Sequence, residues 1–136
     1  MKLNDIEAAG PLKAIVASES SDRFWLKSDR SIYKKVNPRQ IVFVEALDHH
    51  CRFHFKDQSP IVTSARLKSE VYEKNLSHFG IFYLLNRSTI INLEAIDQIE
   101  GNRLIMNGYR PLKSRDLIVS KERRKELFEL LGVQLQ

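Results

Sequence analysis

The sequence predicts one mostly β domain of the α+β class: an antiparallel β fold with one mid-chain helix and a second helix at the C-terminal end. Three observations lead to this prediction. Most of the chain consists of short segments rich in β-branched and aromatic residues, separated by turn residues. Only two segments have the helical period, and they do not alternate with strands as in a parallel α/β sheet. The length of 136 residues suits one domain with a substantial core.

The strand-like segments begin at Phe24. Residues 1–22 contain a Gly-Pro breaker and many small polar residues, so we expect them to be a lead-in that includes a flexible part. The domain itself is predicted to span residues 23–132, and residues 133–136 to form a short tail.

Strands are predicted from β propensity and from apolar alternation. In the first half they fall at 24–28, 31–36, 41–46, 51–56 and 61–63, with a turn at Asp29-Arg30. In the second half they fall at 81–85, 95–100, 103–106 and 109–113. Asn107-Gly108 joins the last two, and Asn-Gly between strands is the strongest short hairpin signal.

The helical period appears in SARLKSEVYEKNL (64–76) and again in SKERRKELFELLG (120–132). Ser64 is a candidate N-cap of the first helix, and Ser120 of the second. Gly132 stands where a left-handed residue ends a helix.

Charge and cysteine content narrow the choice of partner and compartment. The net charge of +5 and the pI of about 9.4 favour an anionic partner such as nucleic acid. The single cysteine, Cys51, excludes an internal disulfide and fits a reducing compartment. No secretory signal and no apolar run of spanning length is present, so we expect a cytoplasmic protein without a membrane partner.

Metal binding is disfavoured at the cluster HHCRFH (49–54). On an extended strand, His50 and His54 share a face but lie roughly 13 Å apart. Cys51 lies on the opposite face, so it is predicted to be a small buried residue. We therefore expect neither a metal site nor a cofactor.

Catalysis has little support in the sequence. Ser88, His78 and Asp97 have the residue types of a catalytic triad, but no Gly-x-Ser-x-Gly elbow surrounds any serine. No glycine-rich nucleotide loop is present. The protein is predicted not to be an enzyme and to have no small-molecule substrate.

Several basic residues stand where predicted strands end, and such loop positions often carry function. Arg87 interrupts two apolar runs, and burying its guanidinium without a partner would be costly. We therefore expect it either to reach solvent at a strand end or to be held out for a partner. Composition alone indicates a basic, β-rich domain that fits nucleic acid.

The order of three motifs resembles the LytTR-type DNA-binding domain family. The family's Ile-x-x-Ile-Glu-Ala strand corresponds to Ile-Val-Phe-Val-Glu-Ala at 41–46. Its His-Arg-Ser-x-x-Val-Asn segment corresponds to Asn-Arg-Ser-Thr-Ile-Ile-Asn at 86–92, and its late Pro-Val-Ser-Arg to Pro-Leu-Lys-Ser-Arg at 111–115. The resemblance covers roughly residues 24–131.

The resemblance implies an elongated β fold whose loops enter successive major grooves of double-stranded DNA to regulate transcription. Carried over, base contacts fall on His50 (with His49 as the near alternative), Arg87 and Arg115. Contacts to the DNA backbone fall on His49, Arg52, Ser88, Lys113 and Ser114. Asn92 is expected to tie the following turn through hydrogen bonds to the backbone.

Departures from the family and competing functions qualify this interpretation. Asn86 replaces a common His, and residues 1–23 are too few for the receiver domain that most relatives carry. We expect a stand-alone binder, or the output half of a longer protein, with a second copy on paired DNA sites.

The alternatives are a protein-interaction domain that retains the fold without DNA binding, and an RNA binder. RNA binding would need exposed aromatic residues, whereas those here lie mostly at predicted core positions.

Overall fold

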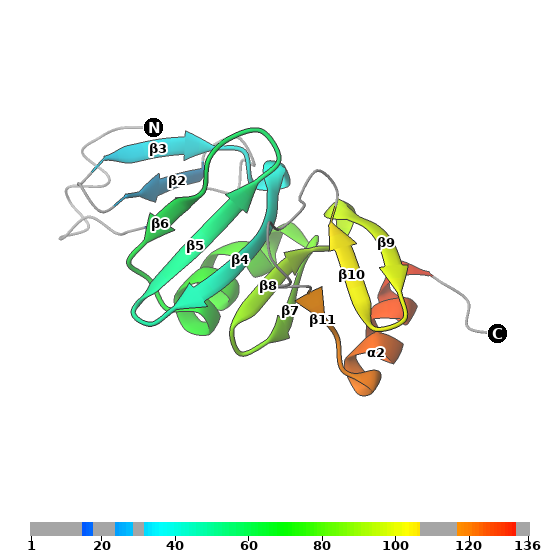
Figure 1. The fold of residues 1–136 in the computed structure, drawn as a ribbon. Helices are drawn as coiled ribbons and strands as arrows, with labels where there is room; N and C mark the ends of the chain where they lie inside the picture. The colour runs from blue at the N-terminus through cyan, green and yellow to red at the C-terminus, as the bar shows by residue number, and fades with distance from the viewer. Residues whose placement is uncertain (1–14, 18–23, 29–31, 107–116, 133–136) are drawn as a thin grey trace.

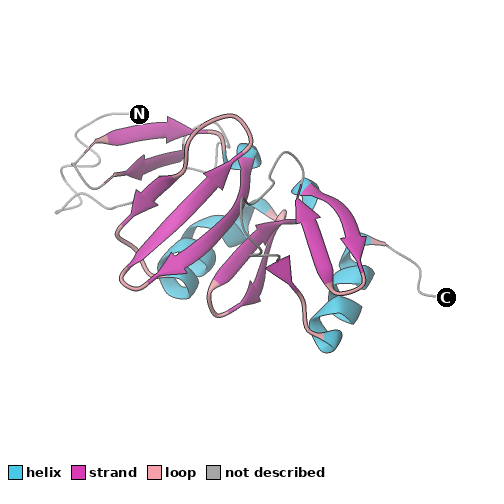
Figure 2. Ribbon diagram, in the orientation of Figure 1, coloured by secondary structure: helices cyan, strands magenta, loops and turns pink. Residues whose placement is uncertain are grey.

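The computed structural model describes residues 15–17, 24–28, 32–106 and 117–132, and it confirms the mostly β prediction. Three antiparallel sheets stand side by side, so the molecule is elongated (Figure 1). Figure 2 shows that strands are the predominant element and that the longer helices lie beside the central and the C-terminal sheets.

The central sheet has five strands in the order β6-β5-β4-β8-β7. All neighbours in it are antiparallel. The strands are β4 (Ile41–Leu47), β5 (His50–Phe55), β6 (Ile61–Thr63), β7 (Phe82–Asn86) and β8 (Thr89–Asn92). β4, β5, β6 and β7 agree with predicted segments, whereas β8 was not predicted as a strand.

Two three-stranded sheets flank the central one, in the orders β1-β2-β3 and β11-β10-β9. Their strands are β1 (Ile15–Ala17), β2 (Phe24–Lys27), β3 (Tyr33–Val36), β9 (Ile96–Glu100), β10 (Arg103–Met106) and β11 (Leu117–Ile118). β1 falls in the predicted lead-in, where it pairs with β2. β11 was not predicted, because two residues are too short to show a period. The predicted turns at Asp29-Arg30 and Asn107-Gly108 and the predicted strand at 109–113 lie outside the described residues.

The helices differ in how well the sequence predicts their ends. In α2 (Lys121–Leu131) the Ser120 hydroxyl accepts from Arg123 N at 3.2 Å, and Gly132 ends the helix at φ 72°, which confirms both predicted caps. The mid-chain helix η2 (Leu67–Leu76) has wide, π-type turns and begins after Arg66. The prediction of Ser64 as its N-cap was therefore wrong. The described residues also contain three short 3-10 turns: η1 (Pro38–Gln40), η3 (Ser77–Phe79) and η4 (Leu93–Ala95).

The central sheet is buried on both faces. One face packs with β2, β3 and η2 around a core that includes Phe24, Leu26, Val44, Phe53, Val71, Leu76 and Ile90. The other packs with the β9–β11 sheet and α2 around a second core that includes Val42, Phe43, Tyr83, Ile91, Leu104, Met106 and Leu127. This explains why β4 reads as a continuous apolar run rather than an alternating one.

A β-bulge in β4 distributes that run between the two cores. The pairing of β4 with β5 slips by one residue between Ile41 and Phe43. Val42 and Phe43 therefore both belong to the second core, whereas Ile41 and Val44 belong to the first. A bulge has this effect because two consecutive residues then oppose a single partner.

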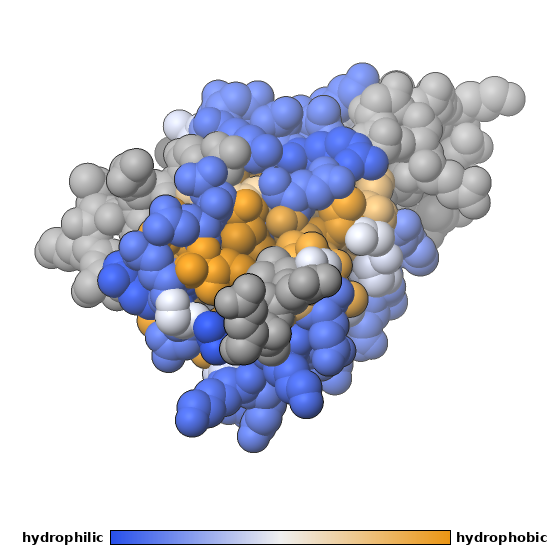
Figure 3. All heavy atoms as spheres, turned by 90° about the vertical axis from the view of Figure 1, so that its right-hand side faces the viewer, coloured by the Kyte–Doolittle hydropathy of each residue, from blue (hydrophilic) through white to orange (hydrophobic). Residues whose placement is uncertain are grey.

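The far end of the molecule, formed by the β9–β11 sheet and α2, carries a patch of apolar side chains surrounded by polar ones (Figure 3). Ile96, Ile99 and Leu131 are only partly buried there against the second core. Leu130, on α2, is exposed. Within the described ranges, none of the helices is long and apolar enough to cross a membrane.

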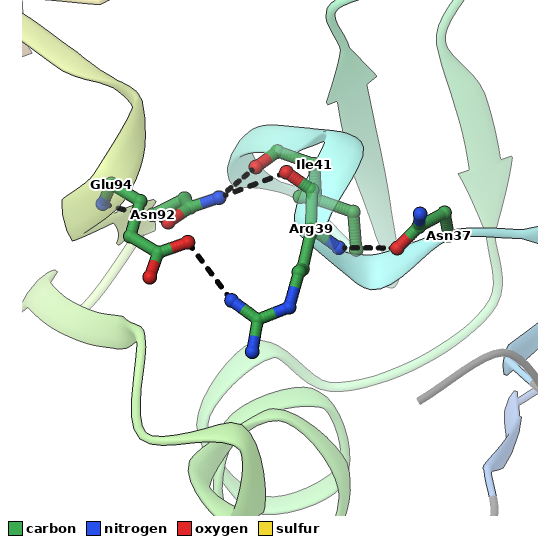
Figure 4. A network of polar contacts seen from close by, with 5 residues as sticks. All are labelled: Asn37, Arg39, Ile41, Asn92 and Glu94. Atoms are coloured by element: carbon green, nitrogen blue, oxygen red, sulfur yellow. Dashed lines mark hydrogen bonds and ion pairs between the residues drawn. The ribbon is translucent and has the colours of Figure 1, made fainter. Parts of the chain in front are cut away.

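Asn92 joins the start of β4 to the turn that follows β8 (Figure 4). Its side chain is completely buried, and its amide donates to Ile41 O at 2.9 Å and to Arg39 O at 3.3 Å. Its Oδ1 accepts from Glu94 N at 2.9 Å, which confirms the predicted role of tying the turn. An exposed ion pair between Arg39 and Glu94 at 3.0 Å spans the same junction.

Replacing Asn92 with Ala should lower the free energy of unfolding by about 1–3 kcal/mol. The reason is that Ile41 O and Glu94 N lose their hydrogen-bond partner where water cannot easily replace it. Urea unfolding followed by circular dichroism measures the change.

Arg39→Ala is the matched control, since it removes only the half-exposed ion pair and should cost less than about 1 kcal/mol. If Asn92→Ala lowered the free energy of unfolding no more than Arg39→Ala does, the structural role of the buried amide would be contradicted.

Candidate nucleic-acid interface

The turns of two hairpins lie at the same end of the central sheet, along the lower edge of the molecule in Figure 1. One turn, Asp48-His49, connects β4 to β5, and the other, Arg87-Ser88, connects β7 to β8. β4 pairs with β8, and beyond their last paired residues Ala46 N donates to Ser88 O at 2.9 Å. This hydrogen bond fixes one turn relative to the strand that leads into the other.

The β4–β5 turn projects a histidine into solvent. Asp48 is the only non-glycine residue with positive φ (55°) in the described part of the chain, and Asp tolerates that conformation. The His49 side chain is 89% exposed, with Nε2 3.9 Å from Asp48 Oδ1. His50 is half-buried and begins β5 opposite Leu47, rather than lying in the loop as predicted.

The β7–β8 turn is held by Asn86. Its Oδ1 accepts from the backbone N of Ser88 at 2.8 Å and from the Ser88 hydroxyl at 2.9 Å. Asn commonly bonds to the backbone two residues ahead, and it stabilises a tight turn in this way. The side chain of Arg87 is exposed at the tip of this turn, which confirms that it reaches solvent at a strand end. Among the described residues, no carboxylate pairs with it.

Arg52 lies within β5 and forms an ion pair. Its guanidinium is 3.0 Å from Glu45 Oε1, on the neighbouring strand β4, and its side chain is 40% exposed. The same oxygen lies 3.2 Å from His54 Nε2. His54 is buried and stacks on Phe43 at 4.2 Å between ring centroids. Glu45 therefore organises the polar residues on this face of the sheet.

Arg115, Lys113 and Ser114, which the sequence assigns to the third contact loop, lie outside the described residues. The two hairpin turns thus bring together His49, His50, Arg87 and Ser88 at one end of the sheet, with Arg52 farther along β5.

The histidines and the cysteine do not form a metal site. Within the described ranges, no group of three or more His, Cys, Asp or Glu side chains is arranged to hold a metal ion. Cys51 is fully buried, as predicted, and its thiol donates to Ala65 O at 3.2 Å. Burial, with a smaller contribution from Glu70, raises the pKa of the Cys51 thiol to about 11, so it is protonated at neutral pH.

Comparison with known proteins identifies the family. The model of the LytTr DNA-binding domain matches residues 31–132. The chain belongs to the LytTR family. Among solved structures, it is similar to a LytTr DNA-binding domain of a response regulator from Bacillus cereus. The TM-score is 0.60 at 19% sequence identity, covering 88% of this chain and 98% of that one. No curated protein matches the chain.

LytTR membership confirms the resemblance drawn from the three motifs. The first motif forms most of β4, and the second forms the end of β7, the turn with its exposed Arg87, and β8. The third, at 111–115, lies outside the described residues. Because LytTR is a family of DNA-binding domains, membership supports DNA binding in general.

Sequence reasoning missed two residues of this end of the LytTR domain. Asn86 was noted only as a departure from His, although an Asn two residues before a Ser in a tight turn is a recognisable capping pattern. Glu45 was read only as part of the strand motif. Its contacts to Arg52 and His54 depend on cross-strand register, which local sequence does not indicate.

We expect the stability of the protein to depend on pH because of the buried His54. Burial lowers the pKa of His54 from its ordinary value of 6.5, and the bond to Glu45 only partly offsets this effect. The unfolded chain therefore binds the proton more readily than the folded chain, and protonation favours unfolding. The stabilising effect of neutral His54 is complete above pH 6.5 and is lost as pH falls from there towards the lower pKa of the folded state.

Urea unfolding between about pH 7.5 and about pH 5.5 measures this dependence. Gln retains a hydrogen-bonding group but does not titrate. The free energy of unfolding of His54→Gln should therefore fall less with decreasing pH than that of the wild type. Equal slopes in the two proteins would show that His54 does not carry the effect.

Proposed function

We propose that this LytTR domain binds double-stranded DNA sequence-specifically, through turns that enter the major groove, and regulates transcription in the cytoplasm. The observation that carries the proposal is the pair of hairpin turns fixed at one end of the central sheet by the Ala46–Ser88 hydrogen bond. A rigid spacing between two exposed turns suits a partner whose features repeat in a fixed geometry, as the grooves of a duplex do.

Arg87 is the side chain best placed to read a base. It is exposed at the tip of the β7–β8 turn, and within the described residues it has no carboxylate partner. An arginine in the major groove recognises guanine through two parallel hydrogen bonds to O6 and N7. We assign base contacts to Arg87, Arg115 and His50, with His49 as the near alternative.

Contacts to the DNA backbone are assigned to His49, Arg52, Ser88, Lys113 and Ser114. Such contacts set register and orientation without reading sequence. Arg52 would keep its ion pair with Glu45 while a remaining guanidinium N–H donates to a phosphate, since arginine has five N–H donors. The net charge of +5 favours this anionic partner.

The proposal extends to the domain as a unit and to its assembly. Residues 23–132 form the binding unit, preceded by a lead-in and followed by a short tail. A second copy occupies a neighbouring site about one helical turn away, so that both copies face the same side of the duplex. We propose that the protein is not an enzyme and uses no cofactor.

The alternative is a protein-interaction domain that retains the LytTR fold without binding DNA. The observation that favours it is the carboxylate of Glu45 beside Arg52, which reduces the positive charge on that face. Arg87, which has no carboxylate partner among the described residues, favours DNA, because an exposed cation on a fixed turn suits a phosphate or a base edge.

Arg87→Ala and Arg115→Ala should each weaken specific DNA binding by about 1–3 kcal/mol and relax the base preference at one position. Both variants should lose less affinity for unrelated duplexes, since non-specific binding depends on total charge. Electrophoretic mobility shifts at several salt concentrations measure both effects, and wild-type affinity should fall steeply as salt rises.

Arg39→Ala is the matched control. It removes the same charge next to the opposite end of β4, where Arg39 pairs with Glu94, and should leave specific binding nearly unchanged. Wild-type affinity and base preference in both Arg87→Ala and Arg115→Ala would refute the assignment of the site. Absence of wild-type binding even at low salt would favour the protein-interaction domain.

A further inference from the structure

The structure assigns a positioning role to Asn86: we propose that this residue fixes the direction in which Arg87 leaves the β7–β8 turn and thereby contributes to base selectivity. The inference rests on the proposed function, because it concerns the DNA-reading role of Arg87. Asn86 is not itself proposed to contact a base.

Ser88 is held by three hydrogen bonds within the protein. Its backbone N–H and its hydroxyl both donate to Asn86 Oδ1, at 2.8 Å and 2.9 Å. Its carbonyl oxygen accepts from Ala46 N at 2.9 Å. Both backbone hydrogen-bonding groups of Ser88 are therefore satisfied within the protein, and the residue is fixed from two sides.

Arg87 lies between these fixed residues. Asn86 and Thr89 are paired across the hairpin, so the turn consists of Arg87 and Ser88 alone. With Ser88 fixed by Asn86 and Ala46, the backbone of Arg87 has little freedom, although its side chain is exposed. The bonds at Ser88 thus determine where the Cα–Cβ bond of Arg87 points.

Directional recognition depends on this arrangement. Bidentate binding of guanine requires the guanidinium plane to approach two acceptors at once, whereas attraction to a phosphate tolerates many orientations. Restricting the backbone before binding also reduces the conformational entropy lost when the complex forms. Loss of Asn86 should therefore weaken specific binding more than non-specific binding.

The chain offers a matched control in Asn37. Its Oδ1 accepts from the backbone N of Arg39 at 3.0 Å, so it caps a turn in the same way as Asn86. Asn37 precedes η1, which leads into the start of β4 at the opposite end of the sheet from the β7–β8 turn. Asn37→Ala and Asn86→Ala thus remove similar exposed caps from positions that differ in their distance from the proposed interface.

The test is a double-mutant cycle of Asn86→Ala with Arg87→Ala, measured as the dissociation constant for a selected duplex. Asn86→Ala alone should weaken specific binding about five- to tenfold, consistent with the loss of hydrogen bonds that order a binding group. In the Arg87→Ala background it should change binding less than about twofold, because the group that it positions is gone. Asn37→Ala should have no effect beyond about twofold in either background.

A readout that needs no DNA accompanies the cycle. In the wild type the backbone amide of Ser88 should be protected from hydrogen exchange, and in Asn86→Ala that protection should fall while the amides of β4 and β8 remain protected. Unchanged exchange at Ser88 would overturn the proposed restraint of the turn.

The outcomes separate the two proposals. An equal loss of affinity from Asn86→Ala with and without Arg87 would overturn the positioning role while leaving DNA binding intact. Absence of wild-type binding to any duplex would overturn the proposed function and, with it, the role of Asn86 in selectivity.

Discussion

The antiparallel pairing of β4 with β8 holds the two halves of the central sheet together. It joins two hairpins that are distant in sequence, and it places both of their turns at one end of the sheet. At the opposite end, the buried Asn92 attaches the start of β4 to the turn after β8. Because the side chains of β4 and β8 are divided between two cores, neither strand can slide without exposing apolar residues.

Burial on both faces gives the exposed turns a rigid support. The bulge in β4 turns Val42 and Phe43 towards the second core, while Ile41 and Val44 pack in the first. The turns themselves contain few apolar residues and gain their order from hydrogen bonds, chiefly those of Asn86 and Ala46. The fold thus separates stability, which lies in the two cores, from recognition, which is proposed for the turns.

Much of the fold could be predicted from sequence because its signals are local. Strand segments follow from apolar patterns, and the caps of α2 at Ser120 and Gly132 follow from residue type and position. The start of η2 could not be predicted, because its wide turns do not follow the usual helical spacing from Ser64. Pairings between strands distant in sequence, such as that of β4 with β8, also leave no local trace.

In the candidate site, too, some features follow from the local sequence and others depend on strand pairing. The position of Arg87 in a turn follows from its place between two apolar runs, and the structure bears this out. The contacts of Glu45 with Arg52 and His54 do not follow, because they require the register of β4 against β5. Glu45 thus partly neutralises Arg52, whereas no carboxylate in the described part of the chain pairs with Arg87, a difference that charge counting along the sequence does not reveal.

Sequence-specific recognition by the turns can be tested by selecting a randomised duplex-DNA library on the purified protein and sequencing the retained DNA. We expect enrichment of a short motif, occurring in two copies about one helical turn apart. Retention without an enriched motif, lost as salt rises, or no retention even at low salt, would contradict sequence-specific recognition by the turns.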